Sequence, residues 1–152
     1  MTKVAAPRTG AMTLVALVAA LVAAALAALP AEAGTNATKP VVSTAKNTSL
    51  GKTVLVTPRG LTLYSLSVER HGRFICTDSS CLSFWTPLVV KKGAKPTGIA
   101  GLGTVRRPGG GVQVTYRGGP LYTFYLDRKR GDTGGEGFKD VGTWHAAVKR
   151  TA

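Results

Sequence analysis

Hydrophobic and polar positions alternate with a period of two over much of the chain beyond residue 50. The clearest run is Tyr64-Ser65-Leu66-Ser67-Val68, in which every second side chain is apolar. Because successive side chains of a strand point to opposite faces, this alternation predicts strands with one buried face. No segment beyond residue 33 has a convincing helical period, so we expect an all-β domain.

The same pattern occurs twice. The segment VLVTPRGLTLYSLSVE at 54–69 aligns without a gap with VQVTYRGGPLYTFYLD at 112–127, and seven of the sixteen pairs are identical. Each copy is typical of a β-hairpin, with its turn at 58–60 or at 117–120. Two copies of one supersecondary unit are expected to pack together in a pseudo-twofold relation, because neither buries its apolar face alone.

These copies predict one β domain at 50–150, with a first repeat at about 50–91 and a second at about 102–149. One further strand per repeat is expected at 84–90 and at 143–148, and each would carry a tryptophan. The predicted core follows from the inward positions of these strands. Its members are Val54, Val56, Tyr64, Leu66, Trp85, Leu88, Val112, Val114, Tyr122, Phe124, Trp144 and Val148.

The first 33 residues are typical of a helical export signal. Lys3 and Arg8 precede an unbroken apolar run at 14–29, and Ala31-Glu32-Ala33 places small residues where a signal peptidase cuts. We therefore expect a signal peptide at 1–33, cleaved after about Ala33, and a secreted mature chain. The alternative is a retained membrane anchor, which the short, alanine-rich run fits less well.

Residues 34–49 contain few apolar side chains and are expected to form a flexible linker. The chain has 20 Lys and Arg against 7 Asp and Glu, a formal charge of +13, and removal of Lys3, Arg8 and Glu32 would leave 18 against 6, or +12. This imbalance favours an anionic partner such as a cell-wall polymer or a membrane surface. Nucleic acid is not expected outside the cell, and the charge alone would also keep an exported protein soluble.

Cys76 and Cys81 are the only cysteines. In an exported chain they are expected to form a structural disulfide, since a redox or metal pair usually has the spacing C-x-x-C. The mature chain is expected to contain no transmembrane segment.

Catalytic and cofactor motifs are absent from the sequence, so we expect no enzyme activity, no cofactor and no metal. Asp127, Asp132 and Glu136 have the oxygen ligands that calcium prefers, but their spacing does not match an EF-hand and three cations follow Asp127, so we expect no calcium site. His71 and His145, the only histidines, are expected to be solvated. An enzymatic alternative would need a cleft that brings one of them beside a carboxylate.

Basic residues are interleaved with aromatic ones around the second hairpin. If they share a face they would bind anions, whereas the alternative is a scatter of solvated charges. The candidates are Arg106, Arg107, Arg117, Arg128, Lys129 and Arg130.

The second copy, with Tyr122, Phe124 and Asp127 followed by a Gly-rich loop and Trp144, resembles the secreted-repeat family, which comprises predicted bacterial lipoproteins with a Y-x-[FWY]-x-x-D motif. The first copy resembles the other half of that family. It departs from the motif at Leu66 and Glu69, and the chain lacks the cysteine that carries the lipid. The residues of the first copy that align with the tyrosine, the acid and the tryptophan of the second are Tyr64, Glu69 and Trp85.

This resemblance implies an extracytoplasmic β-repeat protein without an established reaction. Our leading hypothesis is a secreted, non-enzymatic envelope protein that binds an anionic surface component through a basic face. The alternative is a small-ligand, metal or redox-accessory binding module of the envelope, suggested by the aromatic strand at 122–124 and the tryptophan pair.

Overall fold

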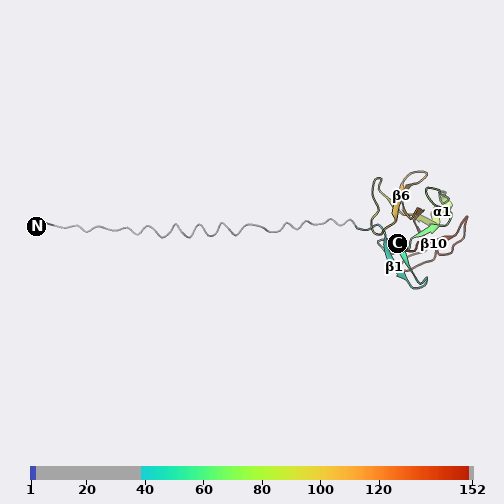
Figure 1. Cartoon of the computed structure of the whole chain (residues 1–152), viewed down its shortest axis with the longest axis horizontal. Helices are drawn as coiled ribbons and strands as arrows, with labels where there is room; N and C mark the ends of the chain where they lie inside the picture. The colour runs from blue at the N-terminus through green and yellow to red at the C-terminus, as the bar shows by residue number, and fades with distance from the viewer. Residues whose placement is uncertain (3–38, 151–152) are drawn as a thin grey trace. The chain divides into compact units, whose positions relative to one another are not determined.

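The computed structural model describes residues 1–2 and 39–150 of the chain. The expected cleavage site and most of the expected signal peptide lie outside the described residues. The regular secondary structure of residues 39–150 is β apart from one short helix, as the alternation predicts, and the ribbon in Figure 1 shows the strands gathered in one body. In these residues no helix is long and apolar enough to cross a membrane.

The strands are short. Their bounds, with that of the one helix found in 39–150, are β1 (Ser43–Asn47), β2 (Lys52–Val56), β3 (Tyr64–Leu66), α1 (Ser79–Phe84), β4 (Trp85–Pro87), β5 (Val89–Val90), β6 (Leu102–Arg106), β7 (Val112–Tyr116), β8 (Gly119–Pro120), β9 (Tyr122–Phe124) and β10 (Trp144–Ala146).

The central sheet has the order β10-β3-β9-β4, and all its pairs are antiparallel. Tyr64 of β3 pairs with Tyr122 of β9, which are equivalent positions of the two repeats. Trp144 pairs with Leu66, and Trp85 pairs with Phe124. The tryptophan strand of each repeat therefore pairs with the tyrosine strand of the other, and this reciprocal exchange is the expected pseudo-twofold relation.

The exchange continues beyond the central sheet. The Leu55 amide donates to the Ala147 carbonyl at 2.8 Å, and the Val114 amide donates to the Leu88 carbonyl at the same distance. In both bonds the donor and the acceptor come from different repeats. Each repeat thus supplies backbone partners that the other needs.

The hairpins are looser than predicted. Gly60 adopts a φ of 89° in the first turn, as tight turns require. The returning chain forms no ladder with β2 and meets it through the bridge between Val56 and Thr62 and the bond from the Leu63 amide to the Leu55 carbonyl at 2.9 Å. The ladder of β2 is made with β1, whereas β3 pairs with β9 and β10. The tyrosine strand β3 therefore takes its ladder partners from the second repeat.

The expected linker at 34–49 is wrong over its second half, while residues 34–38 lie outside the described part. Ser43–Asn47 form β1, which pairs with β2 along five residues. Val42 is fully buried, and the Val41 amide donates to the Thr97 carbonyl at 2.9 Å. The segment is ordered by its backbone hydrogen bonds and one buried valine, which its polar composition does not reveal.

A second correction concerns residues 79–84. They form the helix α1, so Phe84 ends a helix and does not begin a strand. The side chain of Asp78 caps α1 by accepting from the Cys81 amide at 3.0 Å. The expected disulfide between Cys76 and Cys81 is present, with Cα atoms 5.4 Å apart. Six residues are too few to show a helical period, so a cap and a cross-link are the only signals.

Nine of the twelve predicted core residues are buried. Leu88, Val112 and Val148 are partly exposed. Apart from Val114, the prediction missed the buried members of a second apolar cluster, because β2 and its neighbours are covered on both faces and alternation then no longer separates inside from outside. The buried members of that cluster are Val42, Leu55, Leu63, Val114, Tyr116, Leu121 and Ala147.

Candidate functional site

The motif residues form two reciprocal hydrogen bonds inside the domain. The Tyr64 hydroxyl donates to Asp127 Oδ2 at 2.6 Å, and the Tyr122 hydroxyl donates to Glu69 Oε2 at 2.8 Å. In each bond the tyrosine of one repeat holds the acid of the other. The four side chains are buried, so the pairs fasten the two repeats together.

Both acids also anchor the loop that follows them. Glu69 Oε1 accepts from the amides of Ile75 and Cys76 at 2.6 and 2.7 Å, and Asp127 Oδ1 accepts from the Gly134 amide at 3.0 Å. Burial raises the pKa of Asp127, and the hydrogen bond from Tyr64 opposes that rise. The geometry favours a structural part for these carboxylates, since each oxygen already has a partner.

Two further contacts complete the buried network. The indoles of Trp85 and Trp144 stack with their centroids 3.7 Å apart. Arg107 is only 8 % exposed, and its guanidinium donates to the Tyr122 hydroxyl at 3.0 Å, to the Cys76 carbonyl at 2.7 Å and to Gln113 Oε1. The expectation that Arg107 belongs to an anion-binding surface is therefore wrong, because its donors are used in the core.

The outer surface near β3 and β10 carries a polar groove of about 510 Å³. Four exposed cations line it: Lys52, Arg70, Arg117 and Arg150. They come from four separate segments, namely β2, the loop after Glu69, the turn after β7, and the chain beyond β10. The fold thus brings together positive charges that are far apart in the sequence.

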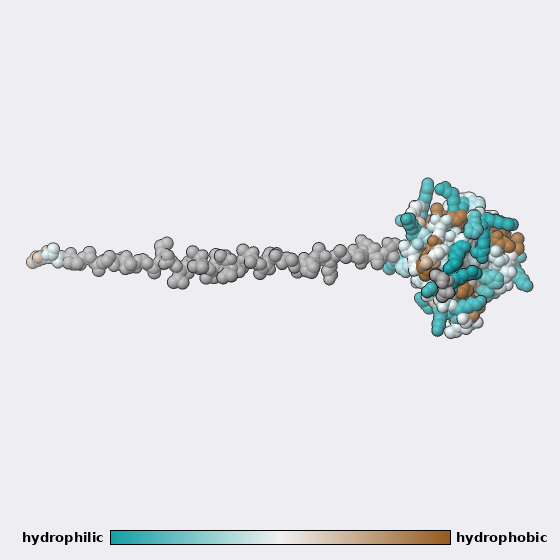
Figure 2. Space-filling view, viewed as in Figure 1, coloured by the Kyte–Doolittle hydropathy of each residue, from teal (hydrophilic) through white to brown (hydrophobic). Residues whose placement is uncertain are grey.

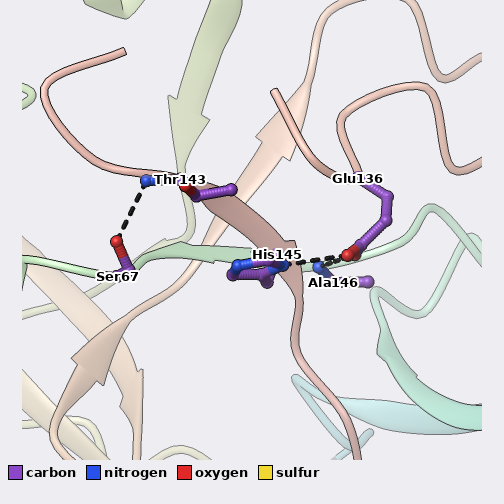
Figure 3. A network of polar contacts seen from close by, with 5 residues as sticks. All are labelled: Ser67, Glu136, Thr143, His145 and Ala146. Carbon is purple, nitrogen blue, oxygen red and sulfur yellow. Dashed lines mark hydrogen bonds and ion pairs between the residues drawn. The ribbon is translucent and has the colours of Figure 1, made fainter. Parts of the chain in front are cut away.

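A histidine–carboxylate pair lies in the same groove (Figure 3). His145 Nδ1 is 2.9 Å from Glu136 Oε1, while Glu136 Oε2 accepts from the Ala146 amide at 2.7 Å. The Glu136 carboxylate therefore holds the imidazole ring and the β10 backbone together. The His145 side chain is 53 % exposed, so its second nitrogen is accessible from the groove.

Hydroxyl groups of β3 and of the residue after it face the same groove. Ser65 pairs with His145 across the two strands, and Ser67 Oγ accepts from the Thr143 amide at 3.0 Å. Among the described residues, neither hydroxyl is hydrogen-bonded to the imidazole. The groove holds the histidine and carboxylate that the enzymatic alternative requires, but not an activated nucleophile.

Sequence reasoning found only part of this groove. Of the expected anion-binding residues, Arg117 lines it, whereas Arg106, Arg128, Lys129 and Arg130 do not. It missed Lys52, Arg70 and Arg150, because these cations lie outside the aromatic-rich segment around the second hairpin. Arg70 had one usable signal, its position directly after the motif acid Glu69.

The remaining candidates are dispersed. Asp132 Oδ2 accepts from the amides of Arg128 and Lys129, so it closes a turn. The His71 side chain is exposed, and its backbone amide donates a hydrogen bond to the Gly118 carbonyl at 3.0 Å. Within the described residues no group of three or more His, Cys, Asp or Glu side chains could hold a metal ion.

Comparison with known proteins gives one match. Residues 103–148 match a family described as a secreted repeat of unknown function. The match covers β6 to β10 and with them the tyrosine, the acid and the tryptophan of the second repeat. No curated protein and no solved structure matches the chain.

Proposed function

We propose that this chain, which carries a secreted repeat at 103–148, is a cell-envelope protein that binds an anionic polymer in the groove lined by Lys52, Arg70, Arg117 and Arg150. The observation that supports the proposal is the convergence of these four cations on one open groove. In the proposal the chain is exported, cleaved after about Ala33, and held at the wall by charge.

The chemistry of the groove suits phosphate or carboxylate groups. A guanidinium presents paired donors that match either anion in a bidentate contact, and Arg70, Arg117 and Arg150 supply three of them. The accessible ring nitrogen of His145 adds a further polar contact. An open groove admits a segment of a chain, so a polymer can pass through it without an end being bound.

Basic residues outside the groove allow a control variant that loses the same amount of charge as a groove variant. Figure 2 shows that hydrophilic residues cover much of the visible face of the domain, so general attraction to anions needs to be separated from binding at a site. Arg128, Lys129 and Arg130 are exposed and do not line the groove. Replacing them by glutamine removes as much charge as replacing Arg70, Arg117 and Arg150.

The experiment measures the retention of both triple variants on isolated cell walls, and on a phosphate polymer and a carboxylate polymer, over a series of salt concentrations. If each groove arginine contributes about 0.7 kcal/mol, the groove variant binds roughly thirtyfold more weakly than the wild type. The Arg128/Lys129/Arg130 variant should lose much less. Equal losses, or retention that does not depend on salt, would contradict a groove site.

A second candidate function is hydrolysis of the bound polymer, favoured by the His145–Glu136 pair in the groove. A histidine oriented by a carboxylate acts as a general base on water. Incubation of the wild type and of His145→Gln with each polymer tests it, since only the wild type should release fragments. Equal release by the two proteins would remove this candidate.

A further inference from the structure

A second surface differs from the groove in chemistry. Several large apolar side chains are exposed beside the disulfide: Phe84 at 37 %, Phe138 at 39 %, Tyr125 at 41 % and Val141 at 68 %. The rings of Phe84 and Tyr125 meet edge to face at 4.9 Å, and those of Phe84 and Phe138 are 6.3 Å apart. Grouped exposed aromatics mark binding sites more often than isolated ones do.

The rings of Phe84 and Phe138 border a pocket of about 350 Å³. Phe84, Phe138 and the buried Trp85 give it aromatic walls, and Cys81 places the disulfide at its side. Its polar groups are Asp78, Ser80, Lys139 and Asp140. Pockets of this size, with aromatic walls and a few polar groups, are typical of small-ligand sites.

We propose that this pocket binds a neutral saccharide ring of an envelope glycan. A pyranose has an apolar C–H face, which packs on an aromatic ring, and a rim of hydroxyl groups, which donate well to carboxylates. Asp78 and Asp140 supply carboxylates next to the rings. Asp78 Oδ1 accepts from the Cys81 amide, and a carboxylate has lone pairs for more than one donor, so it can also accept from a ligand hydroxyl.

The local charge argues against the other occupants. The two aspartates outnumber Lys139 at this pocket, which disfavours an anionic lipid headgroup or a phosphate. The chain as a whole carries a charge of +13, which disfavours an organic cation. A neutral hydroxylated ring meets neither penalty.

The saccharide site is independent of the proposed anion site, since no residue lines both cavities. Binding at the two sites also responds differently to salt. Anion binding in the groove should weaken as salt rises, whereas saccharide binding should not, because it depends on packing and hydrogen bonds. Each proposal can therefore fail without the other.

The test uses the mature chain, titrated with chitotriose and with maltotriose. The intrinsic fluorescence reports binding, because Trp85 lines the pocket and stacks on Trp144. At least one trisaccharide should bind, at an affinity that salt does not change. Phe138→Ala should weaken it about tenfold, equal to about 1.4 kcal/mol, and Asp140→Asn should weaken it without changing the aromatic wall.

Two controls make the result specific. Val89→Ala removes an exposed apolar side chain on β5 that does not line the pocket, and it should bind as the wild type does. The Arg70/Arg117/Arg150 variant should also keep full saccharide affinity. The proposal is overturned if neither trisaccharide binds, if choline binds in their place, or if Phe138→Ala and Val89→Ala have equal effects.

Discussion

The two buried tyrosine–carboxylate bonds predict a measurable difference between Tyr64→Phe and Tyr122→Phe. Tyr64→Phe removes one hydroxyl donor from Asp127, which keeps its bond from the Gly134 amide. A hydrogen bond to a charged group contributes about 1.5–3 kcal/mol. We therefore expect a loss of about 2 kcal/mol in the free energy of unfolding at pH 7, or roughly 8 °C in Tm for a domain of this size.

Tyr122→Phe should cost more. It takes a donor from Glu69 and also an acceptor from Arg107, so two buried charged groups each lose a partner. We expect a loss of about 3 kcal/mol or more. Urea unfolding of both variants measures the difference, and Tyr125→Phe, at an exposed ring, is the control that should stay within about 0.5 kcal/mol of the wild type.

The pH dependence gives a second, independent result for Tyr64→Phe. Because burial raises the pKa of Asp127, the folded protein binds its proton more tightly than the unfolded chain does. The contribution of Asp127 to stability is thus complete below the unfolded pKa of about 3.9 and is lost as pH rises through the folded pKa. Without the Tyr64 hydroxyl, which lowers that pKa, the loss at neutral pH is larger.

The penalty of Tyr64→Phe should therefore shrink from about 2 kcal/mol at pH 7 to about 1 kcal/mol at pH 3, where only a neutral hydrogen bond is lost. Unfolding curves at both pH values measure the change. A variant as stable as the wild type at pH 7, or a penalty that does not depend on pH, would refute the proposed role of this pair.

Three further changes test the packing around the network. Replacing Cys76 and Cys81 by serine should cost about 2 kcal/mol, and the wild type denatured without reductant should show no free thiol. Gly135→Ala should cost about 1–3 kcal/mol in urea, because its Cβ would lie 2.6 Å from Trp85 Cη2. Trp85→Ala should cost about 3–5 kcal/mol and abolish the near-ultraviolet signal of the indole stack.

The sequence predicted the local features of this fold better than its long-range pairing. The repeat at an offset of 58 located the strands that carry Tyr64 and Tyr122, since period-two alternation is a local property. It could not show that the strand of Trp85 pairs with β9, because alternation says which face is buried and not which strand lies beside it.

At the candidate site, too, the sequence predicted local features better than long-range contacts. Arg107 follows another arginine and precedes a proline, so its local sequence is that of an exposed turn. Its burial depends on Tyr122, Gln113 and Cys76, which become its neighbours only through the fold. Lys52, Arg70 and Arg150 of the groove were missed for the same reason, as they come from segments up to about 98 residues apart. Nearness in the sequence therefore predicted neither the burial of Arg107 nor the grouping of the groove cations.

The reciprocal exchange of tryptophan strands also predicts how the domain responds to cleavage. The loop at 91–101 connects the repeats, and a cut there leaves each fragment without the strand that covers its tyrosine. Fragments 39–96 and 97–150 should each be unfolded alone, because Trp85 and Trp144 would then have no stacking partner. Mixed at equal concentration they should associate and recover the near-ultraviolet circular dichroism of the stacked indoles. A fragment that folds alone to a monomer would show that the exchange is dispensable, and the reciprocal bonds of Tyr64 and Tyr122 would then lose their role as the joint between the repeats.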